Sequence, residues 1–179
     1  MLDLTQNYFQ LFGLPVGFGV DPESLTERYR ELQRIVHPDR YASGTEQERR
    51  LSMQGATFLN AALETLRDPL LRAHYLLRLK GAEAGRQHGQ PMDPAFLMEQ
   101  MELREELAEL RHQPDPLAAS EAFIGRVRRR VDELVGRLGE QFAADALPAA
   151  SESVRELQFL RKLQLEAENL EAELEDELL

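Results

Sequence analysis

The chain of 179 residues contains no cysteine. Disulfide bonds are therefore excluded, and so is any metal site that depends on thiolate ligands. No apolar run is long enough to span a bilayer, which excludes a membrane-spanning protein. The N-terminal segment lacks the basic and then apolar layout of a secretory signal, and Asp3 does not suit an organellar transit peptide. These absences predict a soluble protein of the cytoplasm.

The alternation of apolar and polar residues that is typical of β-strands is also missing over any useful length. Helix starts are marked instead, by four Asp-Pro pairs: Asp21-Pro22, Asp68-Pro69, Asp93-Pro94 and Asp115-Pro116. An Asp carboxylate accepts the first free backbone N–H groups of a helix, and Pro suits the first helical position because no N–H is needed there. Thr45 and Glu48 have the spacing of a capping box. We therefore predict an all-α protein.

Charge is distributed unevenly along the chain. Residues 1–80 contain ten Lys and Arg against ten Asp and Glu, so the whole net charge of −11 belongs to residues 81–179. Glycines and a proline near residues 81–91 indicate a loop between the two parts. We predict an N-terminal domain over 1–80, a linker over 81–93 and a C-terminal domain over 94–179. The acidic part should repel nucleic acid and anionic membranes and favour a partner with a basic face.

The tripeptide His37-Pro38-Asp39 separates two predicted helices, one over 21–36 and one over 45–66. Pro38 cannot continue the first helix and sets a stiff bend. The bend should present His37 and Asp39 on a loop, where binding residues tend to lie. Taken alone, the tripeptide would be interpreted as a helix stop with two incidental polar residues.

The segments around the tripeptide resemble a J-domain, the module by which co-chaperones stimulate an ATPase chaperone of the DnaK type. The similar segments are 7–14, 29–32, 37–41 and 60–69, followed by Arg72 and Tyr75. The resemblance implies that His37, Pro38 and Asp39 bind such a chaperone. Further electrostatic contacts are expected from four arginines: Arg28, Arg30, Arg34 and Arg40. Many J-domains have additional basic residues and an aromatic residue where this chain has Glu31, Ile35 and Val36, so its positive surface should be thinner.

Beyond the linker, three stretches carry apolar residues at helical spacing, over 94–111, over 116–142 and from about 148 to the C-terminus. Each has one apolar stripe to bury, and a three-helix bundle is the simplest arrangement that buries all three. The second stretch contains four arginines: Arg126, Arg128, Arg129 and Arg130. Because they point in several directions, we predict a solvated helix face and no nucleic-acid site.

The first of these helices has a second face, opposite the stripe of Phe96, Leu103, Leu107 and Leu110. Residues of that face are Met98, Met101, Glu102, Glu105 and Glu109, with Leu97 at its edge. Two interpretations fit the spacing. The face could be a solvated acidic surface with stray apolar residues, or a docking surface in which methionines adapt to a partner.

The run 95–107, together with segments 41–44 and 154–160, is similar to the HscB family, the J-proteins dedicated to iron–sulfur cluster biogenesis. The resemblance covers nearly the whole chain. It implies two partners, an HscA- or DnaK-type ATPase chaperone and an iron–sulfur cluster scaffold protein of the IscU type. The implied scaffold-binding residues are Leu97, Met98, Met101, Glu102, Glu105, Glu109 and Phe159.

No enzymatic site is predicted, because no nucleophile motif or glycine-rich phosphate loop accompanies His37 and Asp39. The glutamates on the acidic face lack the histidine partners of a di-iron bundle, so neither a metal nor a cofactor is expected. The leading hypothesis is a co-chaperone that stimulates an ATPase and delivers the scaffold protein to it. One alternative is a J-protein of general quality control that binds unfolded chains, and another is a structural helical protein with a chance tripeptide.

Overall fold

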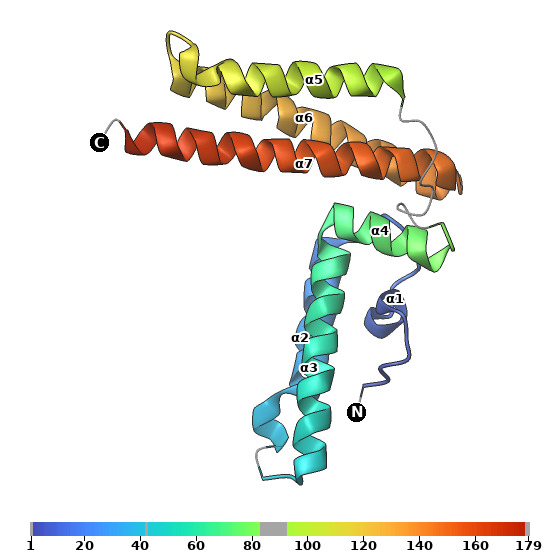
Figure 1. The fold of residues 1–179 in the computed structure, drawn as a ribbon. Coiled ribbons are helices and arrows are strands. Elements are labelled where there is room, and N and C mark those ends of the chain that lie inside the picture. The colour runs from blue at the N-terminus through green and yellow to red at the C-terminus, as the bar shows by residue number, and fades with distance from the viewer. Residues whose placement is uncertain (1, 42, 83–92, 178–179) are drawn as a thin grey trace. The chain divides into compact units, whose positions relative to one another are not determined.

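The computed structural model describes residues 2–41, 43–82 and 93–177, and most of these residues lie in helices (Figure 1). No strand occurs in these ranges, and the all-α prediction is confirmed. The chain divides into two compact units, Met1–Lys80 and Gly81–Leu179. Most of the predicted linker over 81–93 lies outside the described residues.

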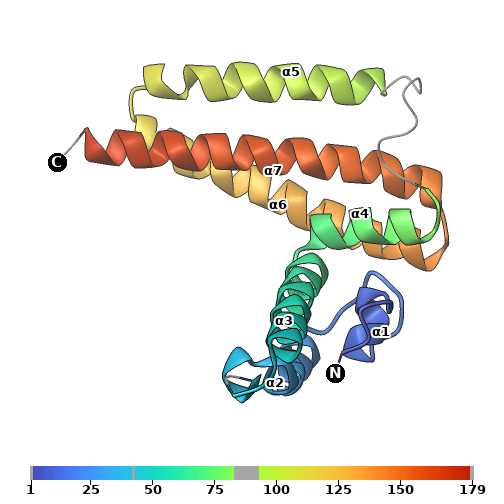
Figure 2. The same cartoon turned by 60° about the horizontal axis from the view of Figure 1, so that its bottom comes forward.

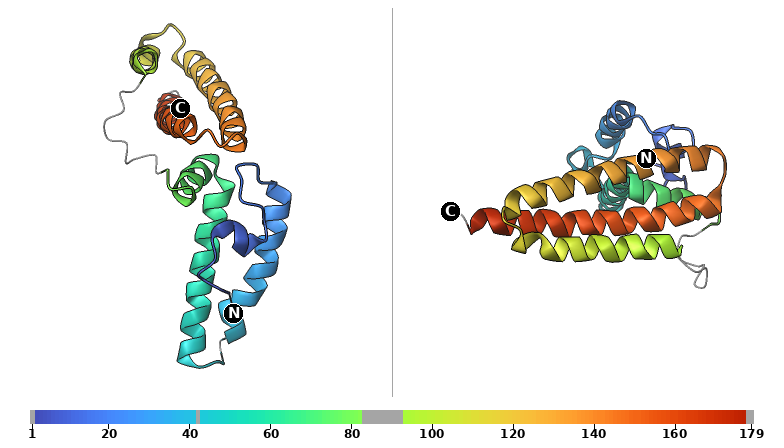
Figure 3. Two further views of the ribbon diagram at one scale, coloured as in Figure 1. Left: turned by 90° about the vertical axis from the view of Figure 1, so that its right-hand side faces the viewer. Right: turned by 90° about the horizontal axis from the view of Figure 1, so that it is seen from above.

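The first unit is a helical hairpin crossed by a short helix. Helix α2 (Pro22–Val36) leads through the 3₁₀ helix η1 (Pro38–Tyr41) to α3 (Glu46–Arg67), and α4 (Pro69–Leu79) follows. Helix α1 (Tyr8–Phe12) lies across the hairpin between α2 and α3 (Figure 3, left). Fully buried side chains fill the space between these helices: Phe9, Phe12, Leu25, Leu59, Leu66, Leu76 and Leu77.

Helix starts follow the predicted capping pattern. In all four Asp-Pro pairs the Asp carboxylate accepts a backbone N–H of the first helical turn, and the Pro occupies that turn, at the starts of α2, α4, α5 and α6. The capping box of Thr45 and Glu48 also forms, with both reciprocal hydrogen bonds present. Local sequence therefore sets where these helices begin.

Two contacts hold α1 in place, one with α4 and one with α2. The Tyr8 N–H donates to the Tyr75 hydroxyl at 2.9 Å, and the two rings stack with centroids 4.5 Å apart. At the other end of α1, Arg28 Nε donates to the Phe12 carbonyl at 3.1 Å. Gly13 ends this helix with φ +64°, a left-handed conformation that favours glycine.

The second unit is the predicted three-helix bundle. Helix α5 (Pro94–Glu109) continues into the 3₁₀ helix η2 (Leu110–His112), and α6 (Pro116–Ala143) and α7 (Leu147–Asp176) complete it (Figures 1 and 2). The stripes of α6 and α7 are buried against each other: Phe123, Ile124, Val127, Leu134, Leu138, Leu157, Leu160 and Leu163. On α5 only Phe96 is buried, and Glu99, Gln100, Leu103 and Leu107 are half-buried, so the rest of this helix is exposed.

The arginines of α6 are exposed or half-buried. The structure adds interhelical ion pairs that periodicity does not reveal. Arg126 pairs with Glu106 of α5, and Arg128 pairs with Glu168 of α7 at 2.8 Å. Exposed pairs of this kind contribute little to stability, because solvent screens them.

Candidate functional site

The end of α2 is pinned to α3 immediately before the tripeptide. Val36 is buried, and its carbonyl accepts a hydrogen bond from Ser52 Oγ at 2.7 Å. Gly55 faces the same residue, and a Cβ there would lie 3.0 Å from Val36 Cγ1. The absence of a side chain at Gly55 therefore lets α3 approach the base of the loop closely.

His37 and Asp39 lie together on the loop that follows. The Asp39 N–H donates to His37 Nδ1 at 3.3 Å, and the Asp39 carboxylate lies 3.6 Å from the same nitrogen. Because Nδ1 accepts a hydrogen bond, the ring proton belongs on Nε2 in this arrangement. The His37 and Asp39 side chains are 51% and 91% exposed, so the loop offers one N–H donor and one carboxylate to a partner. Pro38 is the first residue of η1.

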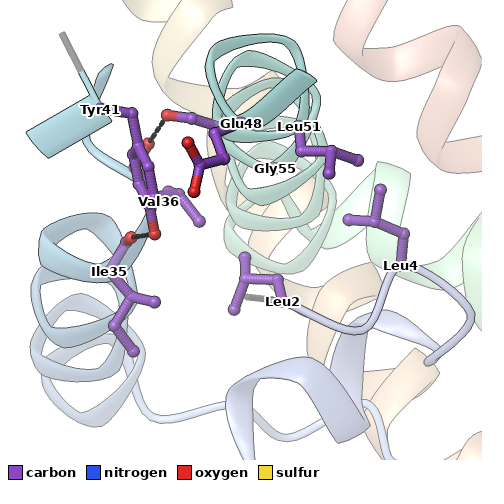
Figure 4. Close-up of a pocket in the computed structure, with 9 residues that line it drawn as sticks. Leu2, Leu4, Ile35, Val36, Tyr41, Glu48, Leu51 and Gly55 are labelled. Atoms are coloured by element: carbon purple, nitrogen blue, oxygen red, sulfur yellow. Dashed lines mark hydrogen bonds between the residues drawn. The ribbon is translucent and has the colours of Figure 1, made fainter. Parts of the chain in front are cut away.

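A small apolar pocket lies beside this loop (Figure 4). Its apolar walls come from three segments of the chain: Leu2, Leu4, Ile35, Val36 and Leu51. The Tyr41 hydroxyl donates to the Ile35 carbonyl at 3.2 Å and ties η1 back to the end of α2. On the far side, hydrogen bonds from Thr45 hold the pKa of Glu48 below its usual value. The loop is therefore held before His37 by the bond from Ser52 and after Asp39 by the bond from Tyr41. The sequence alone did not indicate this role of Tyr41.

The four arginines expected to contact a chaperone divide into two groups. Arg28 is committed to its own unit, since it binds the Phe12 carbonyl and pairs with Glu31 at 2.5 Å. Arg30, Arg34 and Arg40 are exposed, and none of the described residues forms an ion pair with them. Arg30 and Arg34 are one turn apart on α2, so they face the same way.

The acidic-apolar face of α5 points outward, as periodicity predicts. Leu97, Met98 and Met101 are 44%, 64% and 63% exposed, and the stripe residues Phe96 and Leu110 are buried. The three glutamates of the face, Glu102, Glu105 and Glu109, are exposed as well. The resemblance implies that these six exposed residues and Phe159 bind a scaffold protein, and we call the set the docking face.

Phe159 of α7 differs from the rest of the docking face because it is half-buried. Its ring meets Phe96 edge-on, with centroids 5.9 Å apart. The guanidinium carbon of Arg104 lies 5.5 Å from the centre of the same ring. Phe159 therefore joins α5 to α7 as well as lying at the surface, and Arg104 is a residue that the sequence analysis did not single out.

The described ranges contain no group of three or more His, Asp and Glu that could hold a metal ion. None of the helices within them is long and apolar enough to cross a membrane.

A helical hairpin that presents His37-Pro38-Asp39 on its connecting loop, joined in one chain to a three-helix bundle, defines a two-domain J-protein. The bundle matches the family model of the HSCB C-terminal oligomerisation domain over residues 92–168. The whole chain is similar to chaperone HscB from Vibrio cholerae, with 42% identity, a TM-score of 0.83, and coverage of 97% of this chain and 100% of that one. This protein belongs to the HscB family of J-type co-chaperones of iron–sulfur cluster biogenesis.

Two further structures are similar to this chain. Human co-chaperone HscB is 32% identical, with a TM-score of 0.85 and coverage of 93% of this chain and 83% of that one. The Jac1 co-chaperone from Saccharomyces cerevisiae is 24% identical, with a TM-score of 0.73 and coverage of 94% and 95%. At that identity the Jac1 likeness shows a shared fold alone.

Proposed function

We propose that this protein is a cytoplasmic co-chaperone that stimulates the ATPase of an HscA- or DnaK-type chaperone and delivers an IscU-type iron–sulfur scaffold protein to it. The observation that carries the proposal is the presence of two exposed surfaces of opposite chemistry on separate units. One is a loop with neighbouring cations on the first unit. The other is the acidic-apolar docking face on the second.

At the chaperone end, the loop supplies groups that are already in place before binding. The Nε2 proton of His37 can be donated, and the carboxylate of Asp39 can accept from a cationic side chain of the chaperone. Arg30, Arg34 and Arg40 add positive charge that steers an acidic chaperone surface toward the loop. Because the bonds from Ser52 and Tyr41 hold the ends of the loop, binding costs little ordering entropy.

At the scaffold end, Leu97, Met98 and Met101 form a compact group of apolar anchors beside three carboxylates. Such an arrangement matches a folded partner with an apolar pocket and a basic rim. Apolar anchors supply most of the binding energy in an interface, and rim charges mainly set the rate and specificity of association. The two ends on one chain would couple ATP hydrolysis to scaffold delivery.

The alternative function is general quality control, in which the docking face binds unfolded chains. The two exposed methionines favour it to some extent, because methionine adapts to varied partners. The three carboxylates argue for a narrower choice, since they select partners by charge.

Steady-state ATP hydrolysis by the purified chaperone distinguishes the two functions. The protein alone should stimulate hydrolysis, and addition of folded scaffold protein should raise the rate further. In the variant with Glu102→Lys and Glu105→Lys, the increase in hydrolysis rate caused by the scaffold should fall severalfold, because association with the basic partner is slowed. The stimulation by the protein alone should remain. A matched variant, Glu121→Lys with Glu140→Lys, makes the same charge change at exposed positions of α6 and should behave as wild type.

The opposite pattern would favour the alternative. If an unfolded protein raises the rate as much as the scaffold does, or if the scaffold has no effect, selective delivery is wrong. Capture from native cytosol gives the same distinction, since one folded partner is expected in place of many unfolded chains.

A further inference from the structure

Arg104 is the one basic residue of α5 and lies among the acidic residues of that helix. Its side chain is 52% exposed, yet its guanidinium contacts two groups of α7. The guanidinium carbon is 5.5 Å from the centre of the Phe159 ring, and Nη1 is 3.8 Å from Glu166 Oε2. Phe159 and Glu166 are two turns apart on one face of α7, so both are turned toward α5.

The ring of Phe159 is consequently held by α5 from two directions. The buried Phe96 ring meets it edge-on, and Arg104 lies over its face. Glu166 also lies 3.9 Å from Lys162 Nζ, so its carboxylate has two basic neighbours, Arg104 and Lys162. Of these two, Arg104 contacts the Phe159 ring. Removal of Arg104 would take away the contact over the face of the Phe159 ring and so widen the range of rotamers that the ring can adopt.

We propose that Arg104 is a positioning residue of the docking face, which orients the Phe159 ring for the scaffold protein. The inference rests on the proposed function, since it concerns the same surface. An aromatic side chain that is already oriented loses less conformational entropy when the partner binds. Attraction between a guanidinium and a ring at an exposed site corresponds to an effect of about two- to fivefold on affinity.

Whether loss of Arg104 weakens or tightens scaffold binding distinguishes a positioning role from a purely electrostatic one. A partner that complements Glu102, Glu105 and Glu109 has a basic surface, so the positive charge of Arg104 opposes its approach. If Arg104 were only a surface charge, Arg104→Gln would tighten scaffold binding. As a positioning residue, its loss should weaken binding.

Calorimetric titration of the full-length protein with purified scaffold protein tests the inference. Arg104→Gln should bind about two- to fivefold more weakly, and Arg104→Lys, which keeps a cation near the ring, should recover part of the loss. Lys162→Gln is the matched control, because Lys162 also pairs with Glu166 but lies over no aromatic ring of the described residues. This variant should bind as tightly as wild type or more tightly. The aromatic NMR signals of Phe159 should shift in Arg104→Gln and stay in place in Lys162→Gln.

A double-mutant cycle shows whether Arg104 acts through Phe159. In a Phe159→Leu background, Arg104→Gln should cause no further loss of affinity. Unchanged or tighter binding by Arg104→Gln, or an equal loss in both backgrounds, would overturn the inference.

The variant with Leu97, Met98 and Met101 all replaced by Ala is measured alongside, to keep the two claims apart. If that variant loses binding while Arg104→Gln does not, the inference alone fails. If it binds with full affinity, the docking face is wrong, and the inference fails with it.

Discussion

Replacing His37 with Gln should abolish stimulation of the chaperone ATPase and leave the fold intact. The His37 side chain is half exposed and accepts one long hydrogen bond, from the Asp39 N–H at 3.3 Å. Substitutions at such positions usually change the free energy of unfolding by less than about 0.5 kcal/mol. Gln cannot offer an acceptor to the Asp39 N–H and a donor to the chaperone in the geometry of the imidazole ring. Steady-state hydrolysis measures the loss, and circular dichroism of the same sample reports the fold.

His112 provides a matched control for this substitution. It is another exposed histidine beside a carboxylate, with Nδ1 3.7 Å from Glu109 Oε2, but it belongs to the bundle. His112→Gln should stimulate the ATPase as wild type does when no scaffold is present. If His37→Gln stimulated equally well, the loop would not be the chaperone contact.

The second large effect is expected when Leu97, Met98 and Met101 are all replaced by Ala. These side chains are exposed apolar anchors, and each truncation should cost about 1–2 kcal/mol of binding free energy. Even with incomplete additivity, the affinity for the scaffold protein should fall by roughly 100-fold or more. Phe159 is left unchanged, because its contact with the buried Phe96 would confuse a binding effect with a packing effect.

Calorimetry measures the affinity of this triple variant for the scaffold protein, and circular dichroism measures its helicity. Ala is the best helix former, so α5 should keep its helicity. Leu165→Ala is the control, because Leu165 is 58% exposed on α7 and lies outside the docking face. An unchanged scaffold affinity in the triple variant would refute the face, and a loss of helicity would mean that these residues support the bundle.

Helix boundaries could be predicted from sequence because their causes are local. Each Asp-Pro pair contains both the acceptor for the free N–H groups and the residue that suits the first turn, so a helix start needs no distant partner. The outward direction of Met98 and Glu105 could also be predicted, since helical spacing places them opposite the stripe that begins with the buried Phe96. Leu103 and Leu107 of that stripe are half-buried. The C-terminal end of α5 was harder to predict from the sequence. The predicted helix to residue 111 stops at Glu109, and its last turn tightens into η2.

Contacts between helices could not be predicted in the same way. Periodicity assigns a residue to a face of its helix, but it does not say which residue of another helix lies opposite. Arg104 and Phe159 meet only because α5 and α7 pack side by side, and the bond from Tyr41 to the Ile35 carbonyl depends on how η1 turns. For the same reason the sequence did not reveal that Arg28 of α2 donates to the Phe12 carbonyl of α1.

Coupling within one chain is the central claim, and a mixing experiment tests it most directly. His37→Gln has an intact docking face, and the triple Ala variant has an intact loop. ATP hydrolysis is measured with the chaperone, the scaffold protein and equal amounts of both variants. If delivery requires both surfaces on one molecule, the mixture should show only the stimulation of the triple variant, without the added effect of the scaffold. A mixture that restores the full wild-type rate would contradict delivery by a single chain.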